Sequence, residues 1–196
     1  DRADVDGPFA SFDASRGNRA GFAQYQGALG RHDLQLALRH DDNDQFGGHD
    51  TGSIAWGADL AHGFRVTASH GTAFKAPTFN ELYYPFYGNA DLRPETSRSS
   101  EVGLGQRKAS WHWQLNAYQT RIDDLMVYDP HLFVANNIEQ GRIRGAELGG
   151  GTTLAGWTVA AQATWLDPRN ESEALDGKLL PRRWRRCSSS PASGRG

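Results

Sequence analysis

The sequence predicts an all-β protein, and more narrowly an antiparallel transmembrane β-barrel segment of about eight strands. Apolar and polar residues alternate with a period of two in separate stretches, as they do in a strand with one apolar face. The main stretches have roughly nine or ten residues, the length that crosses a bilayer at a tilt. Their connections alternate between short turns and long loops. This rhythm is typical of bacterial outer-membrane barrels, and a soluble sandwich has no reason to keep it.

The amino-terminal part is predicted to be a loop followed by four strands. Residues 1–19 are polar and rich in turn-forming residues, without periodicity, so a loop is expected there. Beyond them, leucine, isoleucine and tryptophan alternate with polar residues or glycine. The predicted strands are 20–29, 33–39, 52–60 and 64–69, with short turns at 30–32 and 61–63 and a long polar loop at 41–51.

The same alternation returns four more times in the second half of the chain. The predicted strands are 101–105, 111–117, 141–149 and 157–165, with turns at 106–110 and 150–156, long loops at 72–98, 122–138 and 167–180, and an additional short strand at 132–135. Trp111, Trp157 and Trp165 fall at strand ends, which indicates an aromatic girdle at a membrane interface. The alternative is tryptophan in the core of a sandwich.

Composition excludes several classes of protein. The mean hydropathy of −0.65 leaves no room for a helix of about 20 apolar residues, but a barrel of alternating strands keeps a low mean hydropathy. The formal net charge of −2 gives no sign of nucleic-acid binding. Cys187 is the only cysteine, so neither a disulfide framework nor a cysteine metal site is expected. The chain starts without an initiator methionine or signal peptide, and we expect it to be an interior piece of a longer protein.

The stretch between residues 72 and 101 is the most informative part of the chain. Three prolines, Pro77, Pro85 and Pro94, are expected to interrupt any helix or central strand. Five aromatic residues lie among polar ones between positions 79 and 87. A loop of this length in an ordered chain is either functional or disordered, and the aromatic content argues against disorder.

This stretch also carries a family resemblance. The segments F-K-A-P-T-F-N-E-L-Y, G-N-A-D-L-R-P-E-T-S and E-V-G resemble the carboxy-terminal barrel half of TonB-dependent outer-membrane receptors. The resemblance extends over residues 18–183. Several segments look most like the cobalamin receptors of that family, namely R-H-D-D-N-D-Q-F-G, S-H-G-T-A-F-K-A-P, N-A-Y-Q-T-R-I-D-D-L-M-V-Y-D, E-Q-G-R-I-R-G-A-E and L-L-P-R-R.

The resemblance implies a barrel of about 22 strands around a plug domain, in the outer membrane of a Gram-negative bacterium. It implies active uptake of a scarce large ligand, with outer-membrane lipid, TonB and cobalamin as partners. We expect residues 1–183 to form part of that barrel, without the plug through which TonB would act. Residues 184–196 are expected to be a tail outside the family, disordered or produced by a frameshift, because they show no alternation.

Two groups of residues are candidates for function. Exposed rings could stack on a large planar or apolar ligand, and the alternative is that they stiffen the loop by packing on one another. The ligand-binding candidates are Phe79, Tyr83, Tyr84, Phe86, Tyr87 and Asn89. The second group is expected to face the lumen and comprises Glu101, Glu147, Arg65 and Arg144. The two glutamates would pair with arginine or contact the plug, and the alternative is that they are simply hydrated.

Other chemistry finds little support in the sequence. The run from Asp41 to Asp44 favours a solvated turn over a calcium loop, because it lacks the ligand spacing. The histidines are scattered and predict no zinc site, and no cofactor is expected. Ser69 and His70 are neighbours and point to opposite faces of a strand, which argues against a hydrolase and leaves no catalytic residues to assign. The remaining alternatives are a siderophore receptor, a soluble β-rich binding domain and a small-barrel enzyme.

Overall fold

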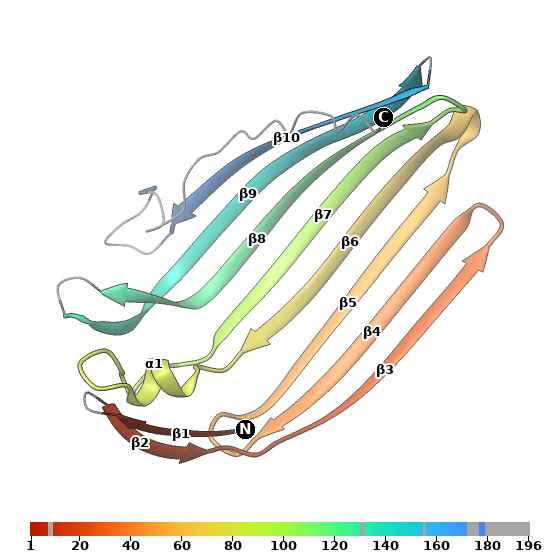
Figure 1. Ribbon diagram of the computed structural model, residues 1–196. Helices are drawn as coiled ribbons and strands as arrows, with labels where there is room; N and C mark the ends of the chain where they lie inside the picture. Colours follow the sequence, from red (N-terminus) through yellow and green to blue (C-terminus); the bar gives the residue numbers. More distant parts are fainter. Residues whose placement is uncertain (8–9, 130–131, 155, 172–176, 179–196) are drawn as a thin grey trace.

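The computed structural model describes residues 1–7, 10–129, 132–154, 156–171 and 177–178. Its main feature is an antiparallel sheet of eight strands in which neighbours in the chain are neighbours in space, in the order β10-β9-β8-β7-β6-β5-β4-β3 (Figure 1). The strands are β3 (Asn18–Leu29), β4 (His32–Asn43), β5 (Gly47–Asp59), β6 (Phe64–Lys75), β7 (Glu95–Arg107), β8 (Trp111–Asp129), β9 (Val134–Leu154) and β10 (Trp157–Asn170). The tail predicted at 184–196 lies outside the described residues.

All eight predicted main strands are present, and the prediction of an antiparallel barrel segment is confirmed. The additional short strand predicted at 132–135 is not a separate element, because residues 134 and 135 begin β9. Most strands are longer than expected, above all β8 and β9, which have 19 and 21 residues. The loops predicted at 41–51 and 122–138 are therefore mostly strand. The alternation of apolar and polar residues marks only the part of each strand that has one apolar face. The backbone hydrogen bonds between strands continue beyond that part, so the strands are longer than the pattern.

The prediction of a loop at residues 1–19 is wrong. β1 (Arg2–Gly7) and β2 (Ala10–Ser15) form a separate two-stranded sheet, in which Val5 lies opposite Phe12. The side chains of Arg2 and Asp13 form an ion pair of 2.9 Å across it. The two strands do alternate, since Ala3 and Val5 face the same side as Ala14 and Phe12. The pattern is weak because each strand has only six residues and most of its apolar side chains are small.

The loop before β7 contains a short helix that the prolines were expected to prevent. α1 (Phe79–Tyr83) lies between Pro77 and Pro85. Thr78 caps it: the Thr78 hydroxyl accepts from the Glu81 amide, and the Glu81 carboxylate accepts from the Thr78 amide at 2.7 Å. This T-x-x-E capping box is a readable helix-start signal. A single 3₁₀ turn, η1 (Ala61–Gly63), connects β5 to β6.

No helix in the described part of the chain is long and apolar enough to cross a membrane.

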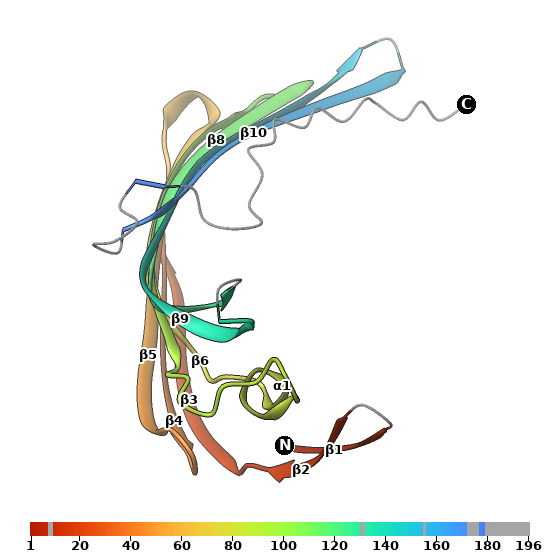
Figure 2. The same ribbon diagram turned by 90° about the vertical axis from the view of Figure 1, so that its left-hand side faces the viewer.

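The sheet is curved (Figure 2), and its two faces differ in chemistry. α1 and the β1–β2 hairpin lie on its hollow side. Leu36, Leu38 and Ile54 lie on the other side, where register places them on one face, and each is more than a third exposed. Among the described residues the buried apolar side chains are few, namely Ala58, Leu82, Leu92, Ala135, Pro77 and Pro168. A soluble sandwich would cover the apolar face with a second sheet; here it is bare.

Candidate ligand-binding loops and the lumen face

The segment 76–94 is an ordered structure with its own small core. Leu82 and Leu92 are 2% and 3% exposed and pack with Ala135 at the start of β9. Three partly buried neighbours complete the cluster: Phe46, Tyr87 and Met126. The apolar residues of the loop thus find partners in the extensions of β8 and β9 beyond the apolar face. Burial of this kind stabilises a loop that prolines alone would leave open.

Polar contacts join the same segment to the β8–β9 hairpin. The side chain of Asn89 donates to the Ala135 carbonyl at 3.1 Å, and the Ala135 amide donates to the Tyr87 carbonyl at 2.8 Å. Asn137 accepts from the Arg93 amide at 2.9 Å and donates to the Arg93 carbonyl at 3.0 Å. These contacts fix the position of the loop relative to the hairpin.

On its other side the segment meets the β1–β2 hairpin through Arg16. The guanidinium donates to the Pro77 carbonyl at 2.9 Å and lies 5.1 Å from the ring centre of Phe79 and 5.6 Å from that of Phe46. Tyr83 accepts a hydrogen bond of 2.9 Å from the Gln45 side chain, and its ring centre lies 6.3 Å from that of Phe12. Three hairpins and α1 therefore meet at one end of the sheet, on its hollow side (Figure 2).

The structure divides the six ligand-binding candidates into two groups. Phe79, Tyr87 and Asn89 are partly buried and serve the loop itself, with Tyr87 stacked on Tyr128 at 6.1 Å. The exposed rings are Tyr83 (37% exposed), Tyr84 (39%) and Phe86 (94%). Packing within the loop therefore accounts for Phe79, Tyr87 and Asn89, and ligand binding stays a prediction for the three exposed rings.

Two apolar residues at the neighbouring hairpin tip are also exposed, although no feature of the sequence marks them as candidates. Leu132 and Phe133 are 61% and 66% exposed. Phe133 and Phe86 both have a left-handed backbone, with φ of 59° and 63°. A bulky residue in this region is strained by about 1–3 kcal/mol, and such strain is often found at ligand-binding sites. No local sequence signal marks Phe133, because its conformation depends on the tip of a long hairpin.

Asp41, near the end of β4, is held by side chains of β4 and β3. Asp41 accepts hydrogen bonds of 2.6 and 2.7 Å from Arg39 and one of 3.0 Å from Asn18. Asp41 lies beyond Leu38, the last apolar residue of β4. The bonds from Arg39 and Asn18 to the carboxylate hold the pKa of Asp41 at about 2. Asp41 and Asn43 are buried, so the expectation of a solvated turn is wrong at these two positions.

The four expected lumen residues do not share one face. Register aligns Glu101 with Ser69, Glu147 with Asn116 and Arg65 with Asp59, all on the hollow side. Arg65 pairs with Asp59 at 2.8 Å and with Asp33, not with the two glutamates. Arg144 lies opposite Gln119 and bonds it at 2.7 Å, on the apolar side. The assignment of Arg144 to the lumen is wrong, because residues three apart in a strand point to opposite faces.

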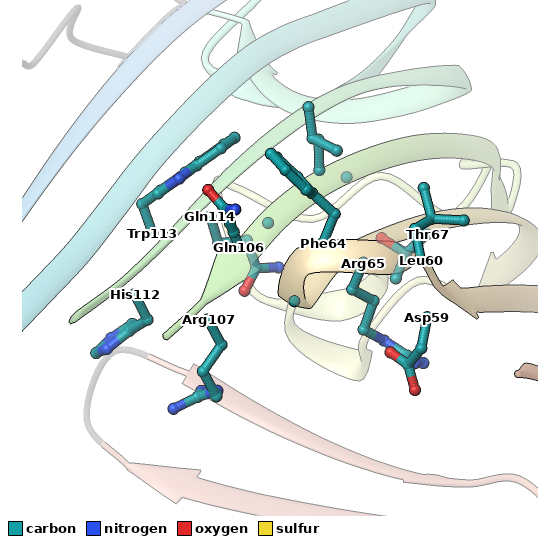
Figure 3. A pocket seen from close by; sticks show the side chains of 14 residues that line it. Asp59, Leu60, Phe64, Arg65, Thr67, Gln106, Arg107, His112, Trp113 and Gln114 are labelled. Carbon is teal, nitrogen blue, oxygen red and sulfur yellow. The ribbon is translucent and has the colours of Figure 1, made fainter. Parts of the chain in front are cut away.

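A hollow of about 480 Å³ lies at the short-turn end of the sheet (Figure 3). Asp59 and Arg65 line one side of it, and Phe64 and Trp113, whose rings meet edge to face at 6.4 Å, line another. Gly103 lies in its wall, where an added Cβ would come within 2.4 Å of the Thr67 hydroxyl. The hollow is at the opposite end of the strands from segment 76–94 and is thus separate from the exposed rings.

The chain matches the family model described as TonB dependent receptor-like, beta-barrel, over residues 1–192. It is 36% identical over 155 residues to the vitamin B12 transporter BtuB of Vibrio vulnificus, covering 77% of this chain and 25% of that protein. It is 32% identical over 153 residues to the vitamin B12 transporter BtuB of Photobacterium profundum, covering 74% of this chain and 25% of that protein. The chain thus spans about a quarter of the length of these curated relatives.

A solved structure shows the same architecture. The siderophore receptor PirA from Pseudomonas aeruginosa superimposes with a TM-score of 0.74 at 24% identity, covering 82% of this chain and 34% of that one. At this identity the likeness concerns the fold alone.

Proposed function

Because the chain belongs to the TonB-dependent receptor-like β-barrel family, we propose that it forms part of an outer-membrane receptor for the active uptake of cobalamin. The observation that carries this proposal is the 36% identity to a protein named as a vitamin B12 transporter. The apolar face would contact outer-membrane lipid, and the hollow face would line the lumen. Energy would come from TonB through a plug domain outside this chain. No catalytic residue and no cofactor is assigned.

The second candidate function is siderophore uptake. It is favoured by one observation, the likeness of the fold to a siderophore receptor. Both functions use the same barrel strands, and they differ in the groups that the surface loops present. In either case the exposed rings of Tyr83, Tyr84 and Phe86 are the ligand contacts we propose within this chain. Large planar or apolar ligands bind exposed rings because burial removes apolar surface from water.

The proposal is tested by ligand binding to the complete polypeptide that carries this chain, in detergent micelles. Cyanocobalamin and a ferric siderophore are titrated separately, and cyanocobalamin is expected to bind. Each of Tyr83→Ala, Tyr84→Ala and Phe86→Ala is expected to weaken its binding about 2- to 10-fold, because an aromatic contact contributes about 0.5–1.5 kcal/mol.

Two controls separate ligand contact from loss of structure. Tyr83→Phe keeps the ring and removes the hydroxyl that Gln45 bonds, so it should bind nearly as the parent does. Trp157→Ala removes a ring that is 64% exposed at the other end of the sheet and should leave the affinity unchanged. If only the ferric siderophore binds, siderophore uptake becomes the proposed function in place of cobalamin uptake. Unchanged cobalamin affinity in all three alanine variants would place the ligand elsewhere.

A further inference from the structure

Four arginines form one continuous row across the last four strands of the sheet. Register places Arg98 of β7 opposite Arg121 of β8, Arg121 opposite Arg142 of β9, and Arg142 opposite Arg169 of β10. Arg144 lies two residues from Arg142 on the same strand and therefore on the same face. The four strands are neighbours in Figure 1. Five guanidinium groups thus gather on one small area of the sheet.

This arrangement is unfavourable without a partner of opposite charge. Like charges directly opposite one another on a sheet destabilise the pairing. Three carboxylates compensate in part: Asp123 bonds Arg98 at 3.2 Å, Asp167 bonds Arg169 at 2.8 Å, and Glu171 pairs with Arg142. Among the described residues Arg144 bonds the amide oxygen of Gln119 and no carboxylate. Two positive charges therefore remain unbalanced within this group of described residues.

Arg121 is the central unbalanced charge. It is exposed, and it lies between Arg98 and Arg142 in the row. Within the part of the chain that the structure describes, no hydrogen bond or ion pair holds its guanidinium. A polar hollow of about 290 Å³ is lined by Arg98, Arg121, Asp123, Gln140 and Glu171, among others. A compact anion can therefore reach both Arg98 and Arg121.

The row lies on the apolar face, just beyond its apolar residues. Toward the loop end, Val102, Ala117, Ala146 and Trp165 form the last apolar row that crosses all four strands. The arginines follow four residues further along each strand. That spacing is about 13 Å along the strand, or about 10 Å along the membrane normal for a tilted strand. Because the strands of a barrel are tilted, the row is inclined to the membrane plane, and the depth of each arginine follows from the last apolar residue of its own strand. This spacing would place the guanidinium groups at the level of the lipid headgroups, on the side of the long loops.

We propose that Arg98, Arg121, Arg142, Arg144 and Arg169 bind the phosphate groups of outer-leaflet lipid headgroups. The proposal rests on the membrane location given under Proposed function. Guanidinium groups form paired, charge-assisted hydrogen bonds with phosphate oxygens. The lipid phosphate supplies the negative charge that the row lacks, and it holds the receptor at a defined depth. Lipid is favoured over a soluble anion because the site continues directly into the apolar face.

The test measures lipid binding to the complete polypeptide in a non-ionic detergent. The probe is diphosphorylated lipid A in mixed micelles, and dephosphorylated lipid A is the matched ligand. The phosphorylated form is expected to bind more tightly. Arg121→Gln should weaken its binding about fivefold, as expected for one arginine at a membrane surface. Asp123→Asn should tighten binding, because it frees Arg98.

Arg19→Gln is the matched control variant. Arg19 is an exposed arginine on the same face and at the same end of the sheet, on β3, where it lies opposite Asp42 and not another arginine. It should bind lipid A as the parent protein does.

The inference is overturned if Arg121→Gln loses no more affinity than Arg19→Gln, if removing the phosphates from the lipid has no effect, or if inorganic phosphate at the lipid's concentration displaces it. If Arg121→Gln fails to fold, lipid binding is measured with Arg144→Gln instead.

Failure of this inference is distinguishable from failure of the proposed function. Cyanocobalamin binding in the same micelles reports on the surface loops, and Arg121→Gln should leave it unchanged. If the protein binds lipid but not cobalamin, the proposal of cobalamin as the ligand is wrong and the proposal of the arginine site stands. If the protein binds cobalamin and Arg121→Gln does not change lipid binding, the arginine site is wrong and the proposed function stands.

Discussion

Arg16 connects parts of the chain that are far apart in sequence. Its side chain is 9% exposed, donates to the Pro77 carbonyl, and lies over the rings of Phe46 and Phe79. An ion pair of 3.9 Å also reaches Asp1. A buried guanidinium needs such partners, because an uncompensated buried charge is strongly unfavourable. One residue thus positions the β1–β2 hairpin, the β4–β5 turn and the segment before α1.

Replacing Arg16 is predicted to loosen α1 and its neighbours without unfolding the sheet. Arg16→Met keeps the aliphatic stem on the rings and removes the charged hydrogen bond, which contributes about 1.5–3 kcal/mol. Hydrogen exchange of the amides in 79–83 should accelerate about 10- to 100-fold in consequence, while that of β6 and β7 stays slow. Arg31→Met, at an exposed turn, is the control and should change neither. Equal exchange in the two variants would show that Arg16 does not hold the loop.

At the scale of elements, backbone pairing and capping extend order beyond the apolar pattern. β8 and β9 pair from Trp111–Thr152 to Asp129–Val134, well beyond the apolar face. Their extension supplies Met126 and Ala135 to the loop core. α1 is short, so its formation depends on the capping box and on burial of Leu82. Segment 76–94 is therefore held in place by contacts with neighbouring elements.

The capping box gives a prediction for α1. Thr78→Ala removes the hydroxyl that accepts from the Glu81 amide, and such a loss costs about 1 kcal/mol. Exchange of the amides in 79–83 should accelerate about fivefold as a result, and ligand affinity should fall with it. Thr78→Ser keeps an accepting hydroxyl and should behave as the parent does. If the alanine and serine variants exchange alike, the cap contributes nothing to α1.

At the scale of the whole molecule, the two faces of the curved sheet differ in chemistry. Leu36, Leu38 and Ile54 are exposed on one face, while Gln35 and Ser53 belong to the other. A sheet with an uncovered apolar face needs lipid or detergent in place of a second layer. This arrangement disfavours the soluble binding domain that composition alone left open.

A pair of neighbouring substitutions tests this division. Leu36→Arg places a charge on the apolar face and should destabilise the folded protein in lipid vesicles by about 2–4 kcal/mol if Leu36 lies near the bilayer midplane. Gln35→Arg places the same charge on the hollow face and should cost far less. Urea unfolding in vesicles measures both. Equal destabilisation would contradict the assignment of the apolar face to lipid.

The sequence by itself determined the number and order of the strands of the main sheet and which residues share a face. It also determined the family, through the segments around residues 72–103. These properties are local, because alternation lies within one strand and the motif within one segment. The sequence also contains the information that Arg144 and Glu147 lie on opposite faces, because the two residues are three positions apart in one strand.

The tertiary structure alone decided which aromatic residues are exposed, since Tyr87 is covered by Tyr128 and Phe79 by Arg16. It also decided the pairing of Arg98, Arg121, Arg142 and Arg169 in one row. Both depend on contacts between distant parts of the chain and on strand register. Register is set jointly by turn geometry and by pairing along whole strands, so no single segment encodes it.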